Sequence, residues 1–163
     1  MTSMSAHDLV IRNASLVDGT GAPARMADVA VSDGVITEVG PRLAGTGSRE
    51  IDADGLTVTP GFVDIHTHFD GQATWDPILA PSSIHGVTSI MMGNCGVGFA
   101  PARPTPDQHA WLIGMLEGVE DIPGTALAEG LAWDWETFPD YMNALDRREY
   151  AIDIATQVAH APL

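Results

Sequence analysis

The sequence contains no lysine: its seven basic residues are all arginines, and they face 22 acidic residues, for a formal net charge of −15. A surface of this sign repels phosphate backbones and anionic lipid headgroups. We therefore expect neither nucleic acid nor a membrane surface as a partner. The simplest explanation of the acidic charge is that it keeps the protein surface soluble, and the charge by itself does not indicate catalysis.

Cysteine and long apolar runs are equally scarce. Cys95 is the only cysteine, so no internal disulfide is possible and nothing argues for an oxidising compartment. No run reaches the roughly 18 apolar residues of a membrane span. The first thirteen residues lack the basic start and apolar core of a signal peptide. The expected location is the cytoplasm, and the 45% hydrophobic content predicts a globular core.

The first third of the chain consists of short apolar segments separated by turn residues. Residues 29–31 and 35–36 flank Ser32-Asp33-Gly34, which predicts a β-hairpin closed by Asp-Gly. Further short strands are expected at 9–11, 16–17, 50–52 and 56–58. This spacing predicts a small sheet or half of a β-sandwich over residues 1–59.

The pattern changes at Thr59-Pro60-Gly61 to strands that alternate with helices. Strands are expected at 62–65, 87–92 and 150–158, and helices near 77–85, 106–119 and 137–148. The last two helices begin with a threonine cap and a proline in the first turn. Alternation of this kind predicts parallel strands joined by crossover helices, so residues 60–163 are expected to form an α/β region.

His66 and His68 follow the first of these strands. Residues two apart on a strand point to the same face, so both imidazoles can approach one metal ion at the 2.0–2.1 Å typical of zinc. The carboxyl end of a parallel strand is also where α/β architectures carry their chemistry. Asp70 could be a further ligand or could orient an imidazole. The alternative is a turn with two exposed histidines.

Cys95 lies in the turn Gly93-Asn94-Cys95-Gly96, directly after the next predicted strand. A thiolate is a soft zinc ligand, and the two glycines allow a tight turn that presents it. Two other roles are open for the thiol: a small buried apolar group, or a nucleophile, although no base is evident nearby in the sequence. His7, His85, His109, His160 and the four tryptophans are expected to serve mainly in packing or at the surface.

Several segments together resemble a known family. TPGFVDIHTHFD resembles the first barrel strand of the amidohydrolase superfamily, whose members place a small β-sandwich before a (β/α)8 barrel. HGVTSIMMGNCGVGFAP, MLEGVEDIP and IDIATQVAHAPL resemble the N-acyl-D-amino-acid deacylases, or D-aminoacylases. The resemblance implies an α/β fold: a sandwich portion at 1–59, and the first strands and helices of a truncated TIM barrel at 60–163.

The resemblance also implies a metal centre and a reaction. His66, His68 and Cys95 would hold one or two zinc ions, with the cysteine in the bridging position and Asp70 supporting the site from behind. The implied reaction is zinc-dependent hydrolysis of a small-molecule N-acyl-D-amino acid to a carboxylate and a D-amino acid. The general base, an aspartate, is expected beyond Leu163.

Members of this family are several hundred residues long. We therefore expect the chain to be an amino-terminal piece that is inactive alone. Two alternatives remain open: another amidohydrolase that acts on a cyclic amide, and a non-catalytic metal-binding remnant.

Overall fold

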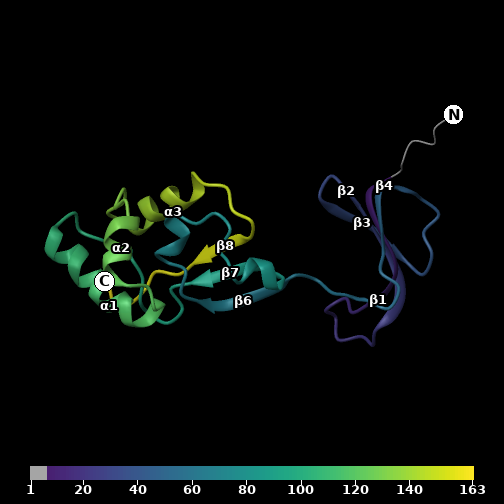
Figure 1. Cartoon of the computed structure of the whole chain (residues 1–163), viewed down its shortest axis with the longest axis horizontal. Coiled ribbons are helices and arrows are strands. Elements are labelled where there is room, and N and C mark those ends of the chain that lie inside the picture. The colour runs from purple at the N-terminus through teal and green to yellow at the C-terminus, as the bar shows by residue number, and fades with distance from the viewer. Residues whose placement is uncertain (1–6) are drawn as a thin grey trace. The chain divides into compact units, whose positions relative to one another are not determined.

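The computed structural model describes residues 7–163. The chain divides after Pro60 into two compact units (Figure 1), and each is described by itself. Within the described residues, no helix combines the length and apolar character needed to cross a membrane.

The first unit is a five-stranded mixed sheet. Its strands are β1 (His7–Leu16), β2 (Arg25–Ser32), β3 (Val35–Gly40), β4 (Gly47–Asp52) and β5 (Thr57–Val58). The order is β3-β2-β1-β4, with β5 also paired to β1. Neighbours β1, β2 and β3 run antiparallel, whereas β4 and β5 run parallel to β1.

The predicted hairpin is confirmed, and two predicted strands merge. Asp33 and Gly34 join β2 to β3 with φ values of 51° and 74°, the left-handed pair that suits a two-residue hairpin turn. The runs at 9–11 and 16–17 belong to the single strand β1, which continues through a bulge. The bulge residue Asn13 has φ 58°, and its N–H donates to the Asp28 carboxylate at 2.9 Å.

The second unit is built on a three-stranded parallel sheet. Its strands β6 (Phe62–Thr67), β7 (Val87–Met92) and β8 (Asp153–Thr156) lie in the order β6-β7-β8. The strand β8 is shorter than the expected 150–158. The helices are α1 (Pro106–Glu120), α2 (Gly124–Gly130) and α3 (Phe138–Asp146), with single 3-10 turns η1 (Gln72–Thr74) and η2 (Ser83–His85).

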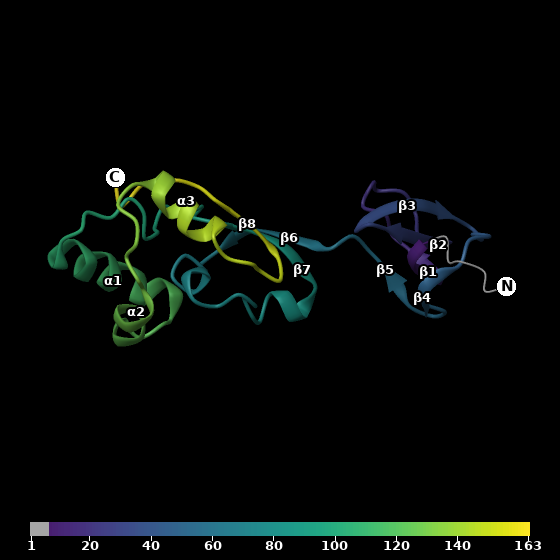
Figure 2. The same ribbon diagram turned by 90° about the horizontal axis from the view of Figure 1, so that it is seen from above.

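The helices occupy two positions around this sheet. In both views α1 and α2 lie beyond the carboxyl ends of the strands, whereas α3 lies on the side of β8 (Figures 1 and 2). The core between helices and sheet includes Ile90, Met92, Leu116 and Tyr141. The helices α1 and α2 therefore lie at the carboxyl end of the sheet, where the candidate ligands were predicted.

Local signals set the helix boundaries. Thr105 caps α1 by accepting from the Gln108 N–H at 3.3 Å, and Thr137 forms a complete capping box with Asp140 at α3. The helix expected near 77–85 is only η2, which ends at Gly86 with φ 90°. The helix α2 was not expected, because it is seven residues long with glycine at both ends.

The aromatic residues mostly pack against one another. Trp135 is 4% exposed and donates its indole N–H to the Phe99 carbonyl at 2.8 Å. His109 stacks on Trp133, with ring centroids 3.8 Å apart and 4° between the planes. Among the tryptophans, Trp111 is the one that is half exposed. The expected packing role holds for Trp75, Trp133 and Trp135, which belong to the core or pack against it, but not for Trp111.

Candidate metal centre

Two neighbouring strand ends bring the candidate ligands together. His68 follows β6 directly and Gly93 follows β7 directly, and these strands are parallel neighbours. One ligand atom from each of His66, His68 and Cys95 lies within 4.8 Å of the others. Among residues 7–163, this is the only group of three or more histidine, cysteine or acidic side chains so close. All three residues are those that the sequence analysis proposed as metal ligands.

The two histidines lie on one face, as the strand periodicity predicts. Their ring centroids are 5.3 Å apart, with the planes tilted by 47°. Thr67, between them, is buried and donates its hydroxyl to the Met91 carbonyl at 2.9 Å. The Asp64 carboxylate accepts a hydrogen bond from the backbone N–H of His66 at 3.1 Å. The buried threonine thus anchors the end of β6 to β7.

Cys95 is presented by a tight four-residue turn. The Gly96 N–H donates to the Gly93 carbonyl at 3.0 Å, which leaves Asn94 and Cys95 at the centre of the turn. Gly93 has φ 77°, and a β-carbon there would come 2.5 Å from the Gln157 carbonyl oxygen. Only glycine fits both conditions. The Asn94 amide donates to the Ile65 carbonyl at 3.0 Å and thereby ties the turn to β6.

The distance between Cys95 and His68 fits a shared zinc ion. Tetrahedral zinc with a nitrogen at about 2.0–2.1 Å and a sulfur at about 2.3 Å separates these ligand atoms by roughly 3.6 Å. Cys95 Sγ lies 3.6 Å from His68 Nδ1. Burial lowers the pKa of His68, and the neighbouring charge of His66 lowers it further. A neutral imidazole keeps a lone pair free for a metal, so the donor chemistry fits as well.

Asp70 is placed differently from the ligands. Its side chain is 2% exposed, and burial raises the pKa of its carboxyl to about 7. Its Oδ1 lies against Gly98, where an added β-carbon would be 3.0 Å away. In the part of the chain that the structure describes, Oδ2 has no hydrogen-bond partner, and neither imidazole bonds to this carboxyl. The supporting role expected for Asp70 stays a prediction.

The loop after β6 has two neighbours that the sequence did not indicate. The Glu120 carboxyl, at the end of α1, accepts from the Gly71 N–H at 3.2 Å. The Tyr141 hydroxyl, on α3, donates to the Asp70 carbonyl at 2.8 Å. These partners are 49 and 71 residues apart in the chain, so no local pattern connects them. His160 is exposed beside Gly96 but does not belong to the ligand cluster.

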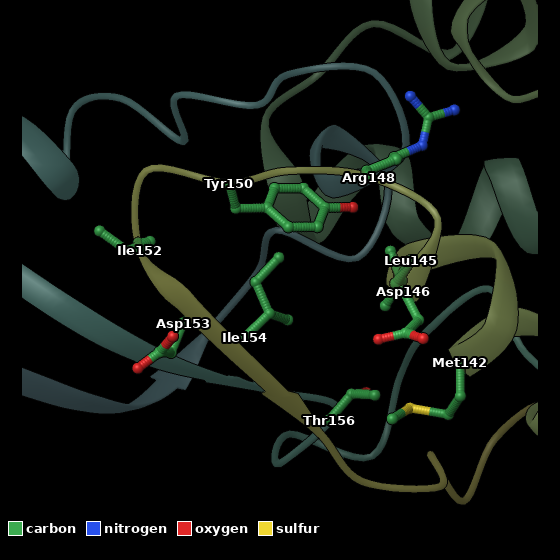
Figure 3. A pocket seen from close by; sticks show the side chains of 9 residues that line it. All are labelled: Met142, Leu145, Asp146, Arg148, Tyr150, Ile152, Asp153, Ile154 and Thr156. Carbon is green, nitrogen blue, oxygen red and sulfur yellow. The ribbon is translucent and has the colours of Figure 1, made fainter. Parts of the chain in front are cut away.

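Two hollows lie near the sheet of the second unit. One, of about 290 Å³, lies between α3 and β8 (Figure 3), and none of the candidate ligands lines it. The other, of about 540 Å³, has Arg103, Trp111 and Ala161 in its wall. The Ala161 N–H donates to the Gly96 carbonyl at 2.8 Å, so this second hollow adjoins the cysteine turn.

Comparisons with known proteins identify the family to which the chain is similar. The model of the amidohydrolase family matches residues 49–163. An N-acyl-D-aspartate deacylase of Alcaligenes xylosoxydans xylosoxydans is 35% identical over 157 residues, which are 96% of this chain and 29% of the relative. A solved D-aminoacylase, studied for its binuclear metal centre, is 33% identical with a TM-score of 0.75, over 96% of this chain and 30% of that chain.

A second solved structure links the same fold to zinc. It is an N-acyl-D-glutamate deacylase from Bordetella bronchiseptica, complexed with zinc and a phosphonate inhibitor that mimics the tetrahedral intermediate. It is 34% identical, with a TM-score of 0.69, over 96% of this chain and 30% of that chain. The present chain thus spans about 30% of the length of the relatives it matches.

Proposed function

The chain belongs to the amidohydrolase family, and we propose that it carries part of the metal centre of a hydrolase that cleaves N-acyl-D-amino acids. The observation behind the proposal is the approach of three ligand atoms, from two parallel strand ends, to within 4.8 Å of one another. Relatives named for deacylation of N-acyl-D-aspartate and N-acyl-D-glutamate support the substrate class, because each matches 96% of this chain.

We propose that His66, His68 and Cys95 hold one or two zinc ions. Zinc, when bound, lowers the pKa of a water ligand and polarises an amide carbonyl. The histidines supply neutral nitrogen donors, and Cys95 supplies a sulfur with enough lone pairs to contact two ions. The binuclear centre and the bound zinc of the solved relatives support this assignment.

We propose that the two units are part of a β-sandwich and the first three strands of a (β/α)8 barrel. The sheet of the second unit supports this, because Val63 and Ile65 on the edge strand β6 are 65% and 68% exposed. Such side chains are expected to be covered when further strands and helices close a barrel. The hollow between α3 and β8 lies at the opposite edge of the same sheet (Figure 3).

We propose that the general base is an aspartate outside these 163 residues. Asp70 is buried and lies outside the ligand cluster of the described residues, so we do not assign the general base to it. Its proposed role is to support the loop behind the ligands. The hollow beside the cysteine turn, with Arg103 in its wall, could receive the carboxylate of a small substrate.

A metal titration tests the proposal on the 163-residue chain. We expect the wild type to bind zinc, and we expect His66→Asn, His68→Asn and Cys95→Ser each to weaken binding at least tenfold. His160→Asn is the matched control, because it removes an exposed histidine beside the same turn but outside the cluster. Equal affinity in all five proteins would contradict the assignment of the ligands.

A further inference from the structure

One peptide group in the loop after β6 is held from both sides. Its carbonyl, from Asp70, accepts the Tyr141 hydroxyl at 2.8 Å, and its N–H, from Gly71, donates to Glu120 Oε1 at 3.2 Å. Tyr141 comes from α3 and Glu120 is the last residue of α1. The peptide lies two residues beyond His68, so two helices fix the chain just after a candidate ligand.

The contact is buried and tightly packed. Tyr141 is 1% exposed, and its ring belongs to the core of the unit. A β-carbon at Gly71 would lie 3.0 Å from Glu120 Oε2 and 3.0 Å from side-chain carbons of Leu127 and Phe99. Glycine therefore lets the carboxyl approach the backbone. The peptide has little room to move without losing one of its two bonds.

The Asp70 side chain connects this peptide to the loop of the other ligand. A β-carbon at Gly98, three residues after Cys95, would be 3.0 Å from Asp70 Oδ1 and 3.2 Å from the Ala159 β-carbon. Asp70 thus fills the space between the loop that carries His68 and the loop that carries Cys95. A shift of the Asp70–Gly71 peptide would therefore move a side chain that lies between these two loops.

We propose that Glu120 and Tyr141 are positioning residues for the metal centre. By holding the Asp70–Gly71 peptide, they set the separation of His68 from Cys95 and thereby the affinity of the site for metal. Neither side chain belongs to the ligand cluster. The inference rests on the proposed function, because it presupposes that the cluster binds metal.

The same helix offers a matched control. Glu117 Oε1 accepts from the Gly124 N–H at 2.7 Å, so a second glutamate of α1 also bonds to a backbone N–H, although at an exposed position. It joins α1 to the start of α2 rather than to the loop after β6. Glu117→Ala therefore removes a side-chain-to-backbone bond from α1 while the Asp70–Gly71 peptide stays held.

The test is a cobalt titration of the 163-residue chain, followed by the thiolate-to-cobalt charge-transfer band that Cys95 would give. We expect Glu120→Ala to weaken cobalt binding ten- to a hundredfold, as is typical when a group that supports metal ligands is lost. Glu120→Gln should keep most of the affinity, because its carbonyl still accepts from Gly71. Glu117→Ala should bind cobalt as the wild type does.

Tyr141→Phe gives a second reading if Glu120→Ala does not fold. It keeps the buried ring, removes only the hydroxyl, and should also weaken binding. Wild-type affinity in either variant removes that residue from the proposal, and wild-type affinity in both overturns it. An equal loss in Glu117→Ala also overturns it, since the effect would then be a general loosening of α1. A wild type without the band would instead contradict the proposed metal centre itself.

Discussion

The buried carboxyl of Glu120 should make the stability of the second unit depend on pH. Burial and, to a smaller extent, the nearby Asp70 carboxyl together raise its pKa to about 8, whereas the usual glutamate value is 4.5. The folded unit therefore keeps this proton up to about pH 8, while the unfolded chain loses it near pH 4.5. Stability from Glu120 is complete below pH 4.5 and is lost as the pH rises toward 8.

The size of the effect follows from the shift. Each pKa unit corresponds to about 1.4 kcal/mol, so the free energy of unfolding should fall by roughly 2–4 kcal/mol over this range, with allowance for partial solvent access. Glu120→Gln cannot release a proton, so its stability should change less with pH and exceed that of the wild type at pH 8. Asp70, with its own raised pKa, should leave a residual slope in the variant.

Urea unfolding between pH 4 and 9, followed by tryptophan fluorescence, measures this. All four tryptophans, Trp75, Trp111, Trp133 and Trp135, belong to the second unit, so the signal reports on that unit. Parallel pH curves for wild type and Glu120→Gln would refute the idea that Glu120 is buried with its proton.

Two further predictions concern the cysteine turn and the sheet edges. Gly93→Ala should destabilise the second unit by about 2–4 kcal/mol, because the new methyl group would meet the Gln157 carbonyl oxygen at a residue with positive φ. Gly114→Ala should instead stabilise the unit by about 0.5–1 kcal/mol, because a β-carbon there would meet open space on α1. Urea unfolding of both variants measures these changes. The 163-residue chain alone should not hydrolyse N-acetyl-D-amino acids. It should also associate through the unpaired edges of β6 and β8. Turnover by a purified monomer would contradict this prediction.

The sequence predicted the parts of this structure that depend on short-range patterns. The Asp33-Gly34 hairpin, the threonine caps of α1 and α3, and the shared face of His66 and His68 each follow from residues within a few positions of one another. Cys95 was expected near the histidines only because the sequence resembles the D-aminoacylases. In the structure, the parallel neighbours β6 and β7 end at the same edge of the sheet, which brings the cysteine turn beside His68.

The features that the sequence did not predict depend on distant contacts. Tyr141 and Glu120 reach the Asp70–Gly71 peptide across 71 and 49 residues, and nothing near either of them indicates the partner. The buried Asp70 carboxyl likewise lies against Gly98, which belongs to the loop after β7. The helix α2 is only seven residues long and lacks a capping side chain at its start, so no amino-terminal signal marked it.

X-ray absorption at the zinc edge, on the 163-residue chain loaded with one equivalent of zinc, tests the metal centre most directly. We expect one sulfur ligand at about 2.3 Å together with nitrogen ligands at about 2.0–2.1 Å. The sulfur shell should disappear in Cys95→Ser, while His160→Asn should leave the spectrum unchanged. A wild-type spectrum with only nitrogen and oxygen neighbours would contradict the placement of Cys95 on the metal.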